Sequence, residues 1–202
     1  QLSRQGHCAV VSLDYRLAPE HRFPTAVHDA WDALNWLHQQ GHEVIGVELS
    51  PIAARAFFKE SHLQPVRHKL GAFTRWSNGR LAIHCGDFFA LTAADLGDVK
   101  AIYDRASLTA LPEELRAAYL AHLRAIVPAD CRILLLTTED AEDHETDEEI
   151  LAISAEIAGL YGRLFNVELK SAQCFLEALP DGAPGELGRV VQKVYFLTPK
   201  PV

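Results

Sequence analysis

The sequence predicts an α/β fold with one open sheet of about seven strands, mostly parallel, whose last strand is antiparallel and whose two faces both carry helices. Two observations support this prediction: short apolar runs alternate with segments of helical period, and charged residues directly follow three of the predicted strands. With 202 residues, 49% of them hydrophobic, the chain is large enough for one core. We therefore expect residues 1–202 to form a single domain.

The predicted elements follow from the pattern of apolar residues and from helix-capping signals. A helix over 25–40 is expected after Thr25, another over 52–60, a third beginning at Pro112, a fourth over 150–161 that ends before Gly162, and a short one over 172–179. A hairpin is expected between the last two strands. The predicted strands are Ala9–Leu13, Val44–Glu48, Leu81–His84, Ala101–Tyr103, Ile133–Thr137, Phe165–Leu169 and Val191–Leu197.

The net charge of −8 is concentrated in one segment. Residues 139–149 contain eight acidic side chains and no lysine or arginine, which leaves 19 acidic and 19 basic residues elsewhere. A cation site around His144 is the alternative interpretation, but the spacing matches no known loop geometry, so we expect a solvated loop that leads into a helix and no metal site. The balanced charge of the rest argues against nucleic acid as a partner.

No apolar run approaches the length of a membrane span, so we expect no membrane partner. The four cysteines are far apart in the sequence, which favours reduced thiols over a disulfide framework or a zinc site. We therefore expect a cytoplasmic monomer that acts on a small molecule.

Three charged motifs occur at the ends of successive predicted strands. Glu48 is placed to accept hydrogen bonds from two ribose hydroxyls. Asp87 can accept a hydrogen bond from an exocyclic amine, while Phe88 offers an apolar wall to a purine ring. Asp104 and Arg105 end the next strand, where a guanidinium can hold an anionic group in a bidentate manner. The series predicts a site for a nucleotide-like ligand.

The same stretches carry a family resemblance. WLHQQGHEVIGVELS at 36–50, CGDFFAL at 85–91, YDRASLTALP at 103–112 and KVYFLTP at 193–199 resemble the bacterial thiopurine S-methyltransferases, over residues 36–202. The resemblance implies a Rossmann-like class I methyltransferase sheet, the cofactor S-adenosyl-L-methionine, and methyl transfer to a thiol, a thiopurine, or a selenium or tellurium compound.

The resemblance also implies roles for individual residues. Glu48 would hold the ribose, Asp87 and Phe88 would contact adenine, and Arg105 would lie at both the cofactor and the substrate sites. No dedicated catalytic residue is expected, because such enzymes work mainly by aligning a soft nucleophile behind the methyl group.

Residues 6–37 resemble a different family. GHCAVVSLDYRLAPEHRFPTAV at 6–27 is similar to the segment that precedes the nucleophile in esterases of the hormone-sensitive lipase group, which are α/β-hydrolases. The chain has neither the Gly-x-Ser-x-Gly elbow nor the glycine-rich oxyanion segment, so His21 and its charged neighbours are interpreted as a polar brace in a loop. The chain thus looks chimeric, esterase-like over 1–37 and methyltransferase-like over 38–202.

This join predicts impaired cofactor binding. The turn after the first strand, at 15–24, contains two prolines and no glycine, where close approach of the backbone to the methionine part of the cofactor is required. Several unmade hydrogen bonds would weaken binding by roughly 10²-fold. Two alternatives remain open at this stage: an inactive chimeric fold or fragment, and a carboxylesterase fragment.

Overall fold

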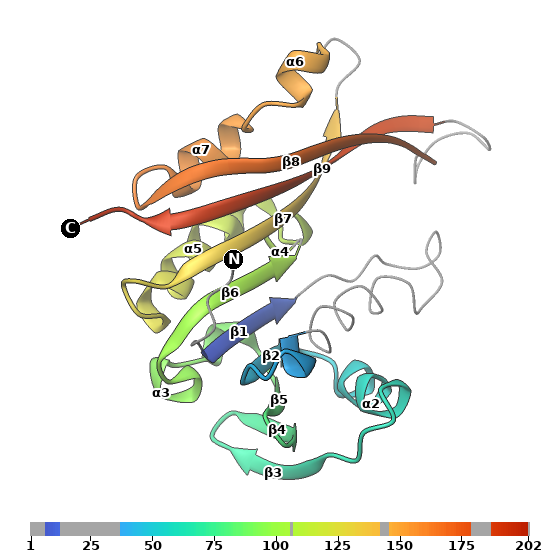
Figure 1. Ribbon diagram of the computed structural model, residues 1–202, viewed down its shortest axis with the longest axis vertical. Helices are drawn as coiled ribbons and strands as arrows, with labels where there is room; N and C mark the ends of the chain where they lie inside the picture. The colour runs from blue at the N-terminus through green and yellow to red at the C-terminus, as the bar shows by residue number, and fades with distance from the viewer. Residues whose placement is uncertain (1–6, 13–36, 106, 142–145, 179–186, 202) are drawn as a thin grey trace.

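The computed structural model describes residues 7–12, 37–105, 107–141, 146–178 and 187–201 (Figure 1). Its strands form one nine-stranded sheet in the order β3-β4-β5-β2-β1-β6-β7-β9-β8. The strands are β1 (His7–Ser12), β2 (Val44–Glu48), β3 (Val66–Leu70), β4 (Phe73–Asn78), β5 (Leu81–Cys85), β6 (Val99–Arg105), β7 (Arg132–Ala141), β8 (Phe165–Ala178) and β9 (Leu187–Pro199).

The sheet is mixed, so the expectation of about seven mostly parallel strands is wrong in number and in direction. The central strands β5, β2, β1, β6 and β7 are parallel, whereas β3, β4, β9 and β8 pair in antiparallel fashion at the two sides. The hairpin β3–β4 was missed because four of the five β3 residues are exposed and the strand has no apolar face. Gly71, with a φ of 54°, permits the tight turn between these strands. The predicted antiparallel final strand is confirmed.

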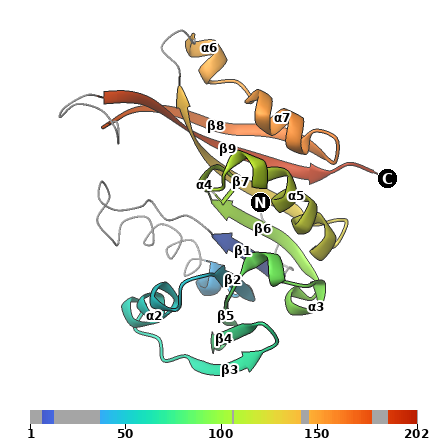
Figure 2. The ribbon, with the colours of Figure 1, turned by 180° about the vertical axis from the view of Figure 1, so that it is seen from behind.

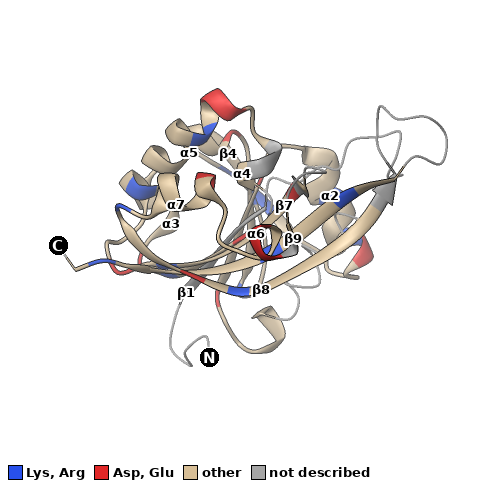
Figure 3. Ribbon diagram, turned by 90° about the horizontal axis from the view of Figure 1, so that it is seen from above, with Lys and Arg blue, Asp and Glu red and all other residues tan. Residues whose placement is uncertain are grey.

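Helices cover both faces of the sheet, as predicted. On one face α2 (Pro51–Glu60) packs on β2 and β5; α3 (Ala93–Leu96), α5 (Glu113–Ile126) and α7 (Ala155–Tyr161) lie on the other (Figures 2 and 3). Alternation along β2 explains the division, since Val44 joins the core under α2 and Val47 the core under α5. Further helical segments are η1 (Phe88–Ala90), α4 (Ser107–Ala110) and α6 (Asp147–Ile150), and residues 37–39 are helical as well.

Two predicted helices differ from the structure. The expected helix over 172–179 is wrong, because β8 continues to Ala178 and stays paired with β9. The expected helix over 150–161 is two short helices, α6 and α7. The hydroxyl of Ser154 accepts a hydrogen bond from the Ile157 N–H at 3.3 Å, which caps α7 and starts it later than the apolar pattern indicated.

Strand β1 occupies the middle of the sheet, between β2 and β6. The first predicted strand is therefore confirmed, whereas the rest of the esterase-like segment, residues 13–36, lies outside the described residues. None of the helices in the described ranges is long and apolar enough to cross a membrane.

Candidate functional site

The carboxyl ends of the parallel strands bring the predicted residues to one edge of the sheet. In the strand register Cys85 lies opposite Glu48, and Ser12 lies opposite Arg105. The last paired residues of β1 and β2 are Val11 and Val47, so Ser12 and Glu48 also share a row. Cys85, Glu48, Ser12 and Arg105 thus form one row across four neighbouring strands, which we call the carboxyl-end row. Adjacent strands in this row are about 4.8 Å apart. Ligands of open α/β sheets bind at this kind of edge.

Glu48 is held by the turn that joins β2 to α2. Its Oε1 accepts a hydrogen bond from the Ser50 N–H at 2.6 Å, and its backbone carbonyl accepts one from the Gly86 N–H at 2.9 Å. Ser50 caps α2, where its Oγ accepts from the Ala53 N–H at 3.4 Å. The carboxylate is therefore fixed at the row by backbone contacts, and the first motif is tied to the second through Gly86.

The second motif turns sharply after β5. A Cβ atom at Gly86 would lie 2.7 Å from the ring of Phe73, so only glycine fits there without movement of that ring. Asp87 follows on the surface, and its Oδ1 accepts a hydrogen bond from the Phe89 N–H at 3.0 Å, which caps η1. The Asp87 carboxylate is exposed beside the row, as its predicted role requires.

Phe88 and Phe89 have opposite environments. The Phe88 side chain is 2% exposed and packs against the rings of Tyr119 and His122, at centroid distances of 4.9 and 5.2 Å. Phe89 is 40% exposed. Contact between Phe88 and adenine stays a prediction, and its ring offers little free surface for such a contact.

Exposed apolar surface next to Glu48 comes from two residues that sequence reasoning missed. Leu49 is 62% exposed and Ile52 is 72% exposed, and both lie in the turn and first residues of α2. Their position in the sequence could have revealed them. Large apolar side chains that follow the acidic residue at the end of a strand lie beyond the sheet, so no face of the sheet buries them. They could cover one face of a flat ring.

Asp104 and Arg105 do not act as a pair. Along β6 they point to opposite faces, and Arg105 shares its face with Tyr103, which packs on the core under α2. Asp104 is fully buried under α5, where its Oδ2 accepts a hydrogen bond from the Tyr119 hydroxyl at 2.7 Å. Asp104 therefore stabilises the core under α5. Of these two residues, only Arg105 belongs to the carboxyl-end row.

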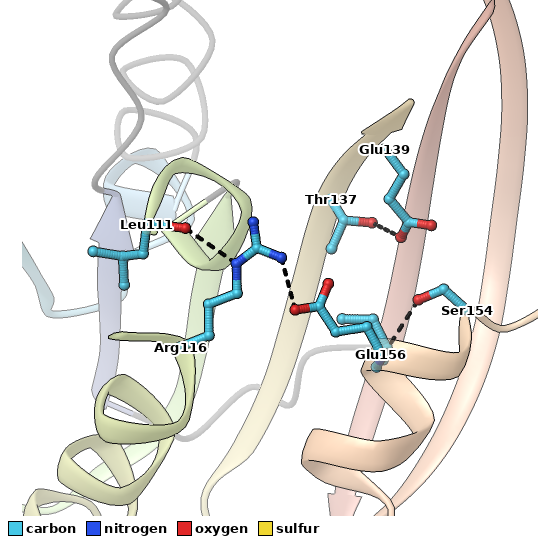
Figure 4. Close-up of polar contacts among 7 residues, drawn as sticks. Leu111, Arg116, Thr137, Glu139, Ser154 and Glu156 are labelled. Atoms are coloured by element: carbon cyan, nitrogen blue, oxygen red, sulfur yellow. Dashed lines mark hydrogen bonds and ion pairs between the residues drawn. The ribbon is translucent and has the colours of Figure 1, made fainter. Parts of the chain in front are cut away.

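Further polar contacts lie on the α5 side of the sheet, near the end of β7 (Figure 4). Arg116 donates from Nη1 to Oε1 of Glu156 at 2.7 Å and links α5 to α7. Glu139 accepts from the Thr137 hydroxyl at 2.6 Å and pairs with Lys193 of β9, with 3.0 Å between Nζ and Oε2. The interpretation of residues 139–149 as a solvated loop is thus wrong for Glu139, which belongs to β7, and for residues 147–149, which belong to α6.

Two buried titratable groups, His84 and Asp104, make the stability of the fold change with pH in opposite directions. Burial, followed by the charge of Arg75, lowers the pKa of His84 to about 4. Burial raises the pKa of Asp104 to about 6, against the hydrogen bonds from Ser107 and Tyr119. Stability from neutral His84 is present above its ordinary pKa of 6.5 and lost as pH falls toward 4. Stability from protonated Asp104 is present below 3.8 and lost as pH rises through about 6.

We expect substitution of these two groups to tilt the stability profile in opposite senses. Between pH 4 and pH 6, the free energy of unfolding of Asp104→Asn minus that of the wild type should rise with pH, and the same difference for His84→Asn should fall. Each change should be on the order of 2 kcal/mol, after allowance for partial screening. Urea unfolding at half-unit pH steps measures both. Parallel profiles for the wild type and both variants would contradict the assignment.

No group of three or more histidine, cysteine or acidic side chains in the described ranges is arranged to hold a metal ion. Cys85, Cys131 and Cys174 are free thiols. What the carboxyl-end row offers is carboxylate acceptors at Glu48 and Asp87, exposed apolar side chains beside them, and one guanidinium. This set suits an uncharged nucleoside with an anionic or polar attachment.

Comparisons with known proteins show which family this chain resembles. A model of the thiopurine S-methyltransferase (TPMT) family matches residues 28–200. The thiopurine S-methyltransferase of Stutzerimonas stutzeri is 52% identical over 165 residues, which are 82% of this chain and 69% of that protein. The enzyme of the same name from Pseudomonas fluorescens is 35% identical over 165 residues, or 82% of this chain and 74% of that protein.

Solved structures with much lower identity share the fold. A SAM-dependent methyltransferase from Anabaena variabilis has a TM-score of 0.52 at 15% identity, covering 96% of this chain and 77% of its own. The N-methyltransferase NodS from Bradyrhizobium japonicum, in complex with S-adenosyl-L-homocysteine, has a TM-score of 0.53 at 8% identity, covering 96% and 79%. The family match begins at residue 28, and so includes the end of the segment that resembles esterases. The chain belongs to the thiopurine S-methyltransferase family.

Proposed function

We propose that this chain binds S-adenosyl-L-methionine at the carboxyl-end row and transfers its methyl group to a small thiol, thiopurine or metalloid acceptor. The observation that carries the proposal is the register, which sets Glu48, Ser12 and Arg105 on three adjacent parallel strands of a family member. The bound cofactor supplies a sulfonium-activated methyl group. The chain itself supplies placement, which is the main requirement for transfer to a soft nucleophile.

Five residues in or beside the row have a chemical task in this proposal. Glu48, fixed by the Ser50 N–H, accepts from the ribose hydroxyls, and the exposed carboxylate of Asp87 accepts from the adenine amine. Leu49 and Ile52 cover the purine, a role that the sequence had assigned to Phe88. Arg105 orients an anionic part of the cofactor or acceptor. The chimeric origin of residues 1–37 and the weak contact to the methionine part remain proposals from the sequence.

Calorimetric titration with S-adenosyl-L-homocysteine tests the cofactor site. We expect Glu48→Ala and Asp87→Ala each to weaken binding at least tenfold, or about 1.4 kcal/mol, because each removes a carboxylate acceptor. Glu168→Ala, on the distant edge strand β8, is the matched control and should bind as the wild type does. Thermal unfolding of each variant separates lost contacts from lost structure.

Two results would count against the proposal. If wild-type protein releases no heat at millimolar ligand, the cofactor site is absent and the inactive fold is the better account. If all three alanine variants bind equally well, the ligand lies elsewhere and the assignment of Glu48 and Asp87 fails.

A further inference from the structure

A hollow lies away from the carboxyl-end row. It has a volume of about 490 Å³ and lies between α2 and the hairpin β3–β4. Its walls carry Arg55, Lys59, His62 and Arg67, and its lining includes the rings of Phe58 and Trp76. Since α2 begins directly after the row and rises about 1.5 Å per residue, its C-terminal end lies roughly 15 Å from Glu48.

The hollow is basic in a chain whose net charge is −8. Among the described residues no acidic side chain lines it, and none of the ion pairs found between them involves its two arginines, its lysine or its histidine. The α2 C-terminus accounts for part of this charge, because a helix end attracts cations there. It does not account for Arg55, a full turn earlier, or for Arg67, on the facing strand.

The aromatic lining has an unmet hydrogen-bond donor. Trp76 is 5% exposed, and within the described structure its Nε1 is buried with no hydrogen-bond partner. Its ring stacks on Phe58 at a centroid distance of 6.3 Å, and the Arg67 guanidinium lies 4.9 Å from its centroid. Because this N–H is shielded even from water, what Trp76 contributes to the hollow is aromatic surface, backed by Phe58 and covered in part by the Arg67 guanidinium.

One residue that lines the hollow has a backbone conformation in which glycine is more common. His62, which follows the C-cap residue Ser61 of α2, has a φ of 53°, in the left-handed region where glycine is the common choice. The chain carries an imidazole there instead, which adds a donor beside Lys59.

We propose that this hollow binds a small organic phosphate that carries a planar ring. A phosphate monoester brings up to two negative charges and three acceptor oxygens, which match several cationic side chains better than a single carboxylate does. Arg55, Lys59 and Arg67 hold the phosphoryl oxygens, and the ring lies against the apolar side chains of Leu63 and Pro65. The site is independent of the cofactor row and of methyl transfer.

Titration with uridine 5′-monophosphate tests the proposal, in the presence of saturating S-adenosyl-L-homocysteine so that the row is not available. Uridine has the same ring without the anion, and inorganic phosphate has the anion without the ring. We expect the monophosphate to bind at least tenfold more tightly than either, with an affinity that falls as salt is raised.

Variants then locate the site. Arg55→Glu combined with Arg67→Glu should weaken the monophosphate at least tenfold, whereas Arg132→Glu combined with Arg163→Glu, exposed residues elsewhere with the same total change of charge, should have no effect. Equal binding of uridine, equal binding of phosphate, or equal loss in the two double variants would each overturn the proposal.

Discussion

Replacement of Phe88 by alanine is expected to lower the free energy of unfolding by about 3–5 kcal/mol. The reason is its burial: the ring is 2% exposed and is enclosed by Tyr119, His122 and the apolar side chains of the core under α5. Removing it leaves a cavity beside η1, directly after the proposed adenine-binding residue Asp87. Urea unfolding followed by far-ultraviolet circular dichroism measures the change.

The adjacent residue supplies a matched control for this experiment. Phe89→Ala removes the same side chain from a position that is 40% exposed, and should cost about 1 kcal/mol or less. Phe88→Leu should also be mild, at less than about 1.5 kcal/mol, because most of the buried volume is kept. Equal costs for the two alanine variants would mean that Phe88 is not part of the core.

The second large effect is expected at the Glu139–Lys193 ion pair. Glu139→Ala should destabilise the fold by about 3–5 kcal/mol, because it leaves the ammonium group of Lys193, a residue 3% exposed, without its counter-charge. Glu139 also accepts from the hydroxyls of Thr137 and Tyr195, so its loss removes the acceptor of both hydroxyl hydrogens. The same glutamate and burial together raise the pKa of Tyr195 to about 12, with burial the larger cause.

A double-mutant cycle separates the charge from the packing. Lys193→Met should cost less than about 1.5 kcal/mol, because Glu139 keeps its hydroxyl donors and is partly exposed. Combining Glu139→Ala with Lys193→Met should then be less destabilising than Glu139→Ala alone. Strictly additive costs would show that the ion pair contributes nothing.

The sequence predicted strands well where both faces are buried. Val44–Glu48 was predicted with its observed bounds, because its apolar residues contribute to the cores on both sides of the sheet. The strand Val66–Leu70 could not be found this way, since its polar side chains face water and it is held by backbone pairing to β4. In the same way, β8 beyond Leu169 depends on its partner β9 rather than on local pattern.

The candidate site shows the same division between local and tertiary information. That Glu48 and Arg105 would share an edge followed from their positions at the ends of parallel strands. That Asp104 would face the opposite core, and that Phe88 rather than Phe89 would be buried, depended on which face each residue presents to α5. The charge and spacing of residues do not determine which face of the sheet a side chain lies on, because a shift of one residue along a strand moves it to the opposite face.

The central position of β1 has a consequence for how the protein is made. This strand leaves the ribosome before every other described strand, yet one of its two neighbours is β6, about 90 residues further along the chain. Without β1 the sheet separates into two four-stranded halves, β3-β4-β5-β2 and β6-β7-β9-β8. Contacts so distant in sequence form late and slowly. We therefore expect the nascent chain to hold an apolar strand whose second edge stays unpaired until β6 is synthesised, and this edge is a target for chaperones.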